Sequence, residues 1–144
     1  MLKRRILSVL LVLAMLVPFA GAAQTAQDNM RGVWVASVAN IDYPSSAGMT
    51  AQALAAEADT MLDNIAAMGL NTVFLQVRPS ADALYRSGLF PQSRYVSGNC
   101  GASPDGDFDA LAYWVEGAHE RGLQLHAWIN PYRITRNGRE ELDA

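Results

Sequence analysis

The chain has 144 residues, of which 51% are hydrophobic and 17% are charged, and its formal net charge is −3. This acidic balance argues against a nucleic acid or an anionic membrane surface as its partner. The single cysteine, Cys100, excludes an internal disulfide, so the fold must rest on a hydrophobic core.

The first 23 residues have the pattern of a secretory signal peptide. Lys3, Arg4 and Arg5 precede a 12-residue apolar run over 6–17, and the small residues at 20–22 form a cleavage site. The run is short for a membrane span, although an uncleaved N-terminal anchor is the alternative. Cleavage after residue 22 removes three basic residues and no acidic residue, so the net charge falls from −3 to −6. We therefore expect an exported protein, periplasmic or extracellular, with no stable membrane span after cleavage.

The next segments predict a strand, a helix and a second strand. A polar leader over 24–29 precedes a strand over 31–38 and a turn-rich loop over 40–46. A helix is predicted over 50–68, because Thr50 is a suitable N-cap and Gly69 is a suitable C-terminal stop. Its apolar stripe recurs at helical spacing: Leu54, Ala58, Met61, Leu62, Ile65 and Met68. A strand over 72–79 follows and ends at a proline.

A long loop, a second helix and a third strand complete the pattern. The loop over 79–106 exceeds the usual length of about 12–15 residues, so a substrate-binding role is predicted for it. A helix over 108–121, with Asp107 as N-cap and Gly122 as stop, leads into a strand over 123–130. This order predicts an α/β fold with a parallel sheet. Such a sheet needs helices on both faces or closure into a barrel, and residues 140–144 resemble the opening of a helix, so we expect the N-terminal portion of a longer protein.

Polar side chains follow one parity of the second and third strands. In the second strand Phe74, Gln76 and Arg78 alternate with Val73, Leu75 and Val77, and in the third Gln124, His126, Trp128 and Asn130 alternate with Leu123, Leu125, Ala127 and Ile129. Side chains alternate between the two faces of a strand, so the apolar parity suits a face covered by helices. The other parity becomes more polar toward the carboxyl end and suits a barrel interior near a ligand. Trp34, deeper in the first strand, is expected in the core.

Six sequence blocks occur in order between residues 31 and 133. They are Arg31-Gly32-Val33-Trp34-Val35, Asn40-Ile41-Asp42-Tyr43-Pro44-Ser45, Gly69-Leu70-Asn71-Thr72-Val73, Gln76-Val77-Arg78-Pro79, Asp82-Ala83-Leu84-Tyr85 and His126-Ala127-Trp128-Ile129-Asn130-Pro131-Tyr132-Arg133. Their order and spacing resemble glycosyl-hydrolase-like family 10, over residues 30–144. The resemblance implies a (β/α)8 barrel of the TIM type, of which this chain supplies the first three βα units, truncated after them. It also implies an exported bacterial protein that hydrolyses polysaccharide, with peptidoglycan glycan strands as one substrate class.

In such barrels the ligand binds at the carboxyl ends of the strands. The candidates for substrate binding are therefore Asn40 and Asp42 after the first strand, Arg78 and Asp82 after the second, and His126, Trp128, Asn130 and Arg133 on or after the third. Several have a structural alternative: Arg78 could pair with Asp42, Asp42 could cap the adjacent turn, Asp82 could cap a short helix, and Trp128 could fill the core.

The catalytic groups are not evident in this chain. Glycoside hydrolysis normally needs two carboxyl groups, which many barrel glycosidases carry after strands four and seven. We expect them beyond residue 144, with Asp42 only a weak candidate and the fragment inactive by itself. No second ligand is suitably spaced from His126, so neither a metal nor a cofactor is expected.

Two alternative functions remain on the same fold. One is a carbohydrate-binding barrel without a catalytic pair. The other is a metal-dependent deacetylase or lyase that uses His126 and Asp42.

Overall fold

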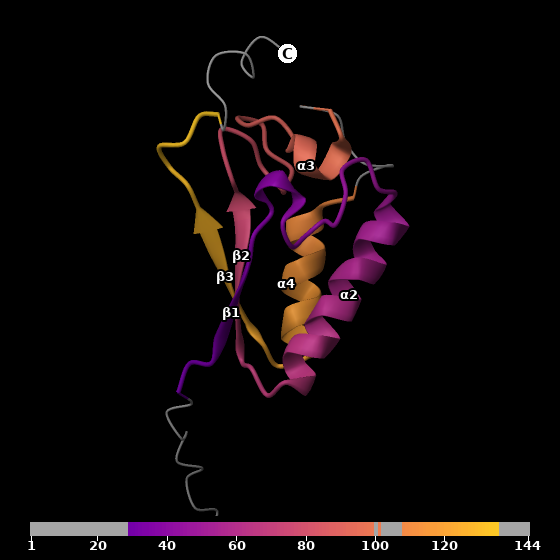
Figure 1. Ribbon diagram of the computed structural model, residues 1–144, viewed down its shortest axis with the longest axis vertical. Helices are drawn as coiled ribbons and strands as arrows, with labels where there is room; N and C mark the ends of the chain where they lie inside the picture. Colours follow the sequence, from indigo (N-terminus) through magenta and orange to yellow (C-terminus); the bar gives the residue numbers. More distant parts are fainter. Residues whose placement is uncertain (1–28, 100, 102–107, 136–144) are drawn as a thin grey trace, which may run out of the picture.

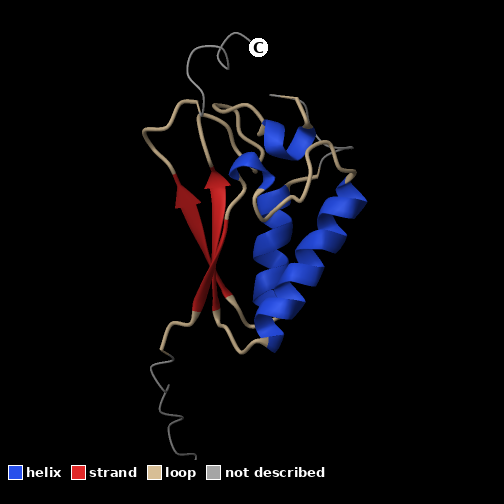
Figure 2. Ribbon diagram, in the orientation of Figure 1, coloured by secondary structure: helices blue, strands red, loops and turns tan. Residues whose placement is uncertain are grey.

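Three parallel strands and two helices form the body of the molecule. The computed structural model describes residues 29–99, 101 and 108–135. In this part the strands β1 (Gly32–Val35), β2 (Thr72–Arg78) and β3 (Gln124–Ile129) form a parallel sheet in the order β1-β2-β3. Helices α2 (Ala51–Ala67) and α4 (Ala110–Glu120) cover one face of the sheet (Figures 1 and 2). The predicted α/β class with a parallel sheet is confirmed and is compatible with part of a TIM-type domain.

Short helices lie at the carboxyl ends of the strands. These are the 3₁₀ helix η1 (Val38–Asn40), which follows β1, and α3 (Arg94–Ser97), which lies within the long loop after β2 (Figure 1). The first strand is therefore shorter than predicted: it ends at Val35, and Ala39 and Asn40 then adopt positive φ angles of 58° and 51°. The chain turns here instead of extending to residue 38.

The helix boundaries follow local capping chemistry. Thr50 caps α2 as predicted, because its hydroxyl oxygen accepts a hydrogen bond from the Ala53 N–H at 3.2 Å. The prediction that Asp107 caps the second long helix is wrong. Asp109 does so, since Oδ1 accepts from the Ala112 N–H at 3.0 Å and Oδ2 accepts from the Arg86 N–H at 3.0 Å. One carboxylate thus starts α4 and ties the long loop to it.

The long loop is built around a buried carboxylate. Asp82 accepts hydrogen bonds from the Ser80 N–H at 3.1 Å and from the Ser93 hydroxyl at 2.6 Å. The alternative that Asp82 caps a short helix is wrong, because Ser93 caps α3 by accepting from the Tyr95 N–H. The loop is therefore an ordered structure, anchored internally at Asp82.

The hydrophobic core lies between the sheet and the two long helices. Its largest fully buried side chains are Trp114, Tyr43, Leu54, Leu62 and Leu75. The Tyr43 and Trp114 rings meet edge to face with centroids 5.0 Å apart, and burial raises the pKa of the Tyr43 phenol. Met68, expected on the buried stripe of the first helix, is exposed because it lies beyond the last turn of α2.

The other face of the sheet is open in the described part of the chain. Trp34 is 60% exposed on it, so the expectation that this side chain lies in the core is wrong. On the helix-facing side of β3, burial decreases along the chain: Leu123, directly before the strand, is buried, Leu125 is half-buried, and Ala127 and Ile129 are exposed. No described helix packs over this end of the edge strand β3, which explains the difference from the prediction.

Some predictions concern residues outside the described ranges. They are the signal peptide over 1–23, the leader over 24–28, Cys100, Asp107 itself and the helix opening over 140–144. None of the helices formed by residues 29–99 and 108–135 is long and apolar enough to cross a membrane.

The two long helices touch at a glycine. A Cβ atom on Gly117 would lie 2.9 Å from Cδ1 of the buried Leu62 on α2. Near the same contact Arg121 binds Asp63 through Nε at 2.6 Å and Asp59 through Nη2 at 3.1 Å. The close approach of α4 to α2 therefore depends on the missing side chain at position 117.

We predict that Gly117→Val in the full-length protein destabilises the fold by about 1–3 kcal/mol, because the added methyl groups overpack the contact with Leu62. Ala112→Val, on the exposed side of the same helix, is the control and should cost about 0.5 kcal/mol through helix propensity alone. Urea unfolding measures both changes. Equal losses of stability in the two variants would contradict a tight contact at Gly117.

Candidate functional site

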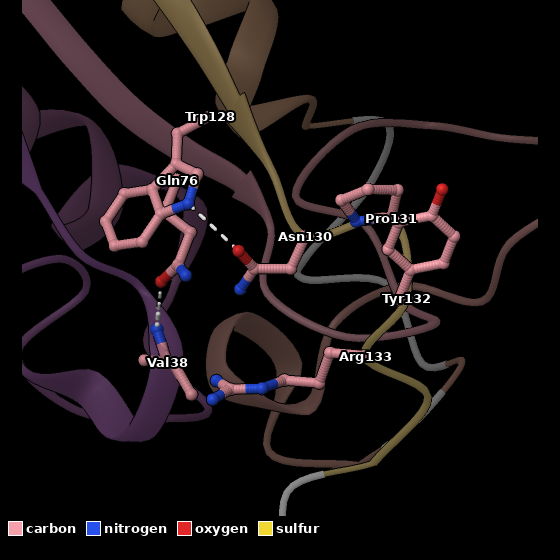
Figure 3. A pocket seen from close by; sticks show the side chains of 7 residues that line it. All are labelled: Val38, Gln76, Trp128, Asn130, Pro131, Tyr132 and Arg133. Carbon is pink, nitrogen blue, oxygen red and sulfur yellow. Dashed lines mark hydrogen bonds between the residues drawn. The ribbon is translucent and has the colours of Figure 1, made fainter.

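An open cleft of about 520 Å³ lies at the carboxyl ends of the strands. Its lining residues come from η1, from the ends of β2 and β3, and from the segment after β3: Val38, Gln76, Trp128, Asn130, Pro131, Tyr132 and Arg133 (Figure 3). The structure thus brings together three of the sequence-predicted residues, namely Trp128, Asn130 and Arg133. Ligands of barrel enzymes bind at this end of the sheet.

Asn130 holds the indole of Trp128 in place. The Trp128 Nε1–H donates to Asn130 Oδ1 at 3.0 Å, and Asn130 Nδ2 donates to the Pro79 carbonyl at 3.0 Å. The amide therefore has one donor partner and one acceptor partner, which fixes its orientation. Because the indole N–H is already bonded, Trp128 offers the cleft the apolar surface of its ring.

Hydrogen bonds also hold the side chain of Gln76, on the neighbouring strand, in place. It is 1% exposed and lies opposite Trp128 in the β2–β3 register. Its Oε1 accepts from the N–H groups of Ser37 and Val38, both at 3.0 Å, and the Ser37 hydroxyl donates to the Gln76 carbonyl at 2.8 Å. Its buried Nε2 has no hydrogen-bond partner among the described residues. An unsatisfied buried donor lowers the stability of the fold by about 1–3 kcal/mol, because the group has lost its hydration.

A row of aromatic rings lies one step deeper on the same face. Trp34, Phe74 and His126 are paired across the three strands. Trp34 stacks on Phe74 with centroids 4.6 Å apart, and His126 lies 5.1 Å from Phe74. Trp34 also meets the edge of Trp128 at 5.3 Å. His126 therefore belongs to this row and does not line the cleft.

Arg78 is placed differently from the sequence expectation. The register of β2 and β3 shifts between Gln76, which pairs with Trp128, and Arg78, which pairs with Ile129. Such bulges re-aim side chains, so the alternation that leads to Gln76 does not continue to Arg78. The Arg78 guanidinium lies 3.8 Å from the centroid of the Phe90 ring instead of lining the cleft.

The remaining candidates hold the loops around the cleft. Asn40 Nδ2 donates to the carbonyls of Pro44 at 2.8 Å and Tyr95 at 2.7 Å, which links the loop after β1 to α3. The exposed Asp42 accepts from the Ala36 N–H at 2.8 Å and so closes its turn. Asp42 and Arg78, both in the described part, form no ion pair, so that alternative is wrong. Asp82 lies inside the long loop.

Four lining residues are not among the candidates predicted from the sequence: Gln76, Val38, Pro131 and Tyr132. Gln76 shares the polar parity of β2, and this was the signal that could have identified it. Pro131 and Tyr132 follow directly on Asn130, whereas nothing in the sequence marks Val38.

The cleft offers an aromatic surface and hydrogen-bond donors. None of its described lining residues is acidic, and within 29–99 and 108–135 no three His, Cys, Asp or Glu side chains gather as a metal site would require. These groups can bind and orient a ligand, whereas the pair of carboxyl groups that glycoside hydrolysis normally uses is absent from the described lining.

We predict that Asn130→Leu in the full-length protein costs about 1–3 kcal/mol of stability, because it leaves the Pro79 carbonyl and the Trp128 N–H without partners. The Trp128 indole N–H should also shift in NMR spectra. Tyr132→Ala, at a side chain that is 95% exposed, should change neither observable. An unchanged indole resonance in Asn130→Leu would contradict the restraint of Trp128 by Asn130.

Known proteins are similar to this chain over most of its length. The model of the family described as Glycosyl hydrolase-like 10 matches residues 29–143. Glycosyl hydrolase YngK of Bacillus subtilis (strain 168) is 45% identical over 121 residues, which cover 84% of this chain and 23% of the relative. Glycosyl hydrolase DigH of Escherichia coli (strain K12) is 35% identical over 136 residues, which cover 86% of this chain and 30% of the relative.

The chain thus spans between 23% and 30% of the length of these relatives. The family match, by contrast, runs through every strand and helix described above. This chain is therefore a member of the glycosyl hydrolase-like 10 family.

Proposed function

We propose that this chain is the N-terminal part of an exported (β/α)8 glycoside hydrolase and forms one wall of its sugar-binding cleft. The observation that carries the proposal is the Trp128 ring, held by Asn130 at the carboxyl ends of parallel strands. A restrained aromatic surface with a few polar groups around it is a common form of ligand site. In a glycosyl hydrolase-like family, a pyranose ring is the ligand that best fits such a surface.

In this proposal the chain binds the sugar, whereas later strands of the full-length protein supply the catalytic groups. Hydrolysis of a glycosidic bond normally uses a carboxylic acid and a second carboxylate on opposite sides of the bond. The carboxylates of both acidic candidates in this chain already accept hydrogen bonds from backbone groups. Asp42 accepts from the Ala36 N–H, and Asp82 accepts from the Ser80 N–H. The catalytic pair is therefore assigned to later strands of the full-length protein, and the fragment by itself is inactive.

The relatives are longer than this chain, which supports the proposal that the chain is part of a longer protein. Since the chain corresponds to 23–30% of their length, there is room in such a protein for the five further βα units of a closed barrel. The proposed substrate is a polysaccharide, with bacterial cell-wall glycan strands the favoured class. Export is proposed from the signal-peptide pattern of the first 23 residues.

A carbohydrate-binding barrel without catalysis is the second candidate. It is favoured by one observation, the lack of acidic side chains among the described lining residues. The metal-dependent alternative draws less support, because His126 packs on Phe74 whereas Asp42 closes a turn after β1. Carboxylates at the ends of the later strands would separate the hydrolase from the binding barrel.

We predict that Trp128→Ala raises the KM of the full-length protein for glycan strands about 10-fold, because the stacking surface is lost. Trp128→Phe should have an intermediate effect, since it keeps an aromatic ring. Release of reducing ends from purified glycan strands measures the activity.

Leu89→Ala is the control, because Leu89 is an 88% exposed apolar side chain outside the cleft. The KM of this variant should equal that of the full-length protein without a substitution. Failure of the full-length protein to release reducing ends from any glycan would refute the hydrolase proposal. An unchanged KM in Trp128→Ala would refute the assignment of the sugar to this cleft.

A further inference from the structure

Gln76 presents a hydrogen-bond donor whose direction is set by its neighbours. The side-chain oxygen faces two backbone N–H groups, those of Ser37 and Val38. A flipped amide would turn its NH2 group against these two donors, so only one orientation is chemically acceptable. The amide nitrogen therefore lies on the side away from Val38, where Figure 3 shows Asn130 and the cleft.

This nitrogen lacks a partner although the site around it is well organised. Of the nearby polar atoms, Asn130 Nδ2 donates to Pro79, and Asn130 Oδ1 accepts from Trp128. Gln76 Nε2 is buried and unpaired in the described structure, while the rest of its residue is held by three hydrogen bonds. A buried donor that is fixed in place and unsatisfied at a cleft is suited to a ligand atom that accepts.

The one charged side chain among the described lining residues, Arg133, is a donor as well. The Arg133 guanidinium extends into the cleft toward Val38 (Figure 3). A guanidinium has N–H donors and no acceptor, and the same holds for the NH2 group of Gln76. A sugar hydroxyl placed between them would bring a proton that neither can accept. A carbonyl or carboxylate oxygen brings no such proton.

We propose that Gln76 is a specificity-determining residue, whose Nε2–H donates to a carbonyl or carboxylate oxygen on the pyranose that stacks on Trp128. The subsite therefore selects sugars that carry an oxygen able only to accept, either an acetamido group or a carboxylate, over unsubstituted sugars. This inference rests on the proposed sugar-binding function and adds the chemical class of the sugar.

The test uses the full-length protein and three β-1,4-linked tetramers whose sugars are all joined by equatorial bonds at C1 and C4. These are the tetramers of N-acetylglucosamine, mannuronic acid and glucose. Their dissociation constants are measured by calorimetry. We expect the N-acetylglucosamine or the mannuronic acid tetramer to bind about 10-fold more tightly than the glucose tetramer. Which of the two binds more tightly tells the acetamido carbonyl from the carboxylate.

Gln76→Glu is the informative variant because it keeps the shape of the side chain. One oxygen still accepts from Ser37 and Val38, whereas the other replaces the donor by an acceptor. Affinity for the preferred tetramer should fall about 10-fold at neutral pH and partly recover near about pH 5, where protonation of the carboxyl group restores an O–H donor. Because a buried carboxylate can also disturb the fold at neutral pH, the recovery supports the donor role only if the melting temperature of Gln76→Glu matches that of the unsubstituted protein at both pH values.

Gln92→Glu is the matched control. Gln92 is also buried and its Nε2 also lacks a partner in the described part, but it lies in the long loop outside the cleft. Its tetramer affinities should equal those of the parent protein.

The inference is overturned alone if the parent protein binds all three tetramers equally well and Gln76→Glu changes none of the affinities. Binding of none of the three tetramers would overturn the inference together with the proposed function.

Discussion

One face of the central strand β2 forms the hydrophobic core and the other forms the open side of the sheet, and the rest of the structure is arranged around this strand. Val73, Leu75 and Val77 are buried against the helices and supply the middle of the hydrophobic core. Phe74 and Gln76 project from the other face, where Phe74 stacks on Trp34 and Gln76 meets the chain after β1. Because side chains alternate along a strand, the burial of one set fixes the position of the other.

Hydrogen bonds from side chains to backbone groups connect the sheet to the loops around the cleft. Gln76 binds two N–H groups at the start of η1, Asn40 links η1 to α3, and Asp82 organises the long loop. Each of these side chains bonds a backbone group of a loop or of a short helix. The cleft is consequently framed by loops with defined contacts, and its Trp128 ring is restrained before any ligand arrives. Such preorganisation reduces the entropy lost on binding.

Periodicity and capping chemistry in the sequence predicted much of this fold. The helix with its Thr50 cap, the strands β2 and β3, and the placement of Trp128, Asn130 and Arg133 at the cleft all follow from local patterns. These features depend on residues that are close in the sequence.

Other features depend on contacts between distant residues, and they were missed for that reason. Asp107 and Asp109 are both suitable caps for α4, and the Arg86 N–H is bound by the latter. The bulge beside Arg78 arises from pairing with β3, which alternation within β2 cannot reveal. Ser93, the partner of Asp82, lies far along the loop, so a local pattern cannot reveal the hydrogen bond between them.

The open face of the sheet and the cleft above it support the proposal that this chain supplies a sugar-binding wall. A crystal structure of the full-length protein with a bound oligosaccharide tests it most directly. We expect a pyranose ring about 4 Å from the Trp128 indole, with a substituent oxygen about 3 Å from Gln76 Nε2. An oligosaccharide that binds elsewhere and contacts neither side chain would contradict the account.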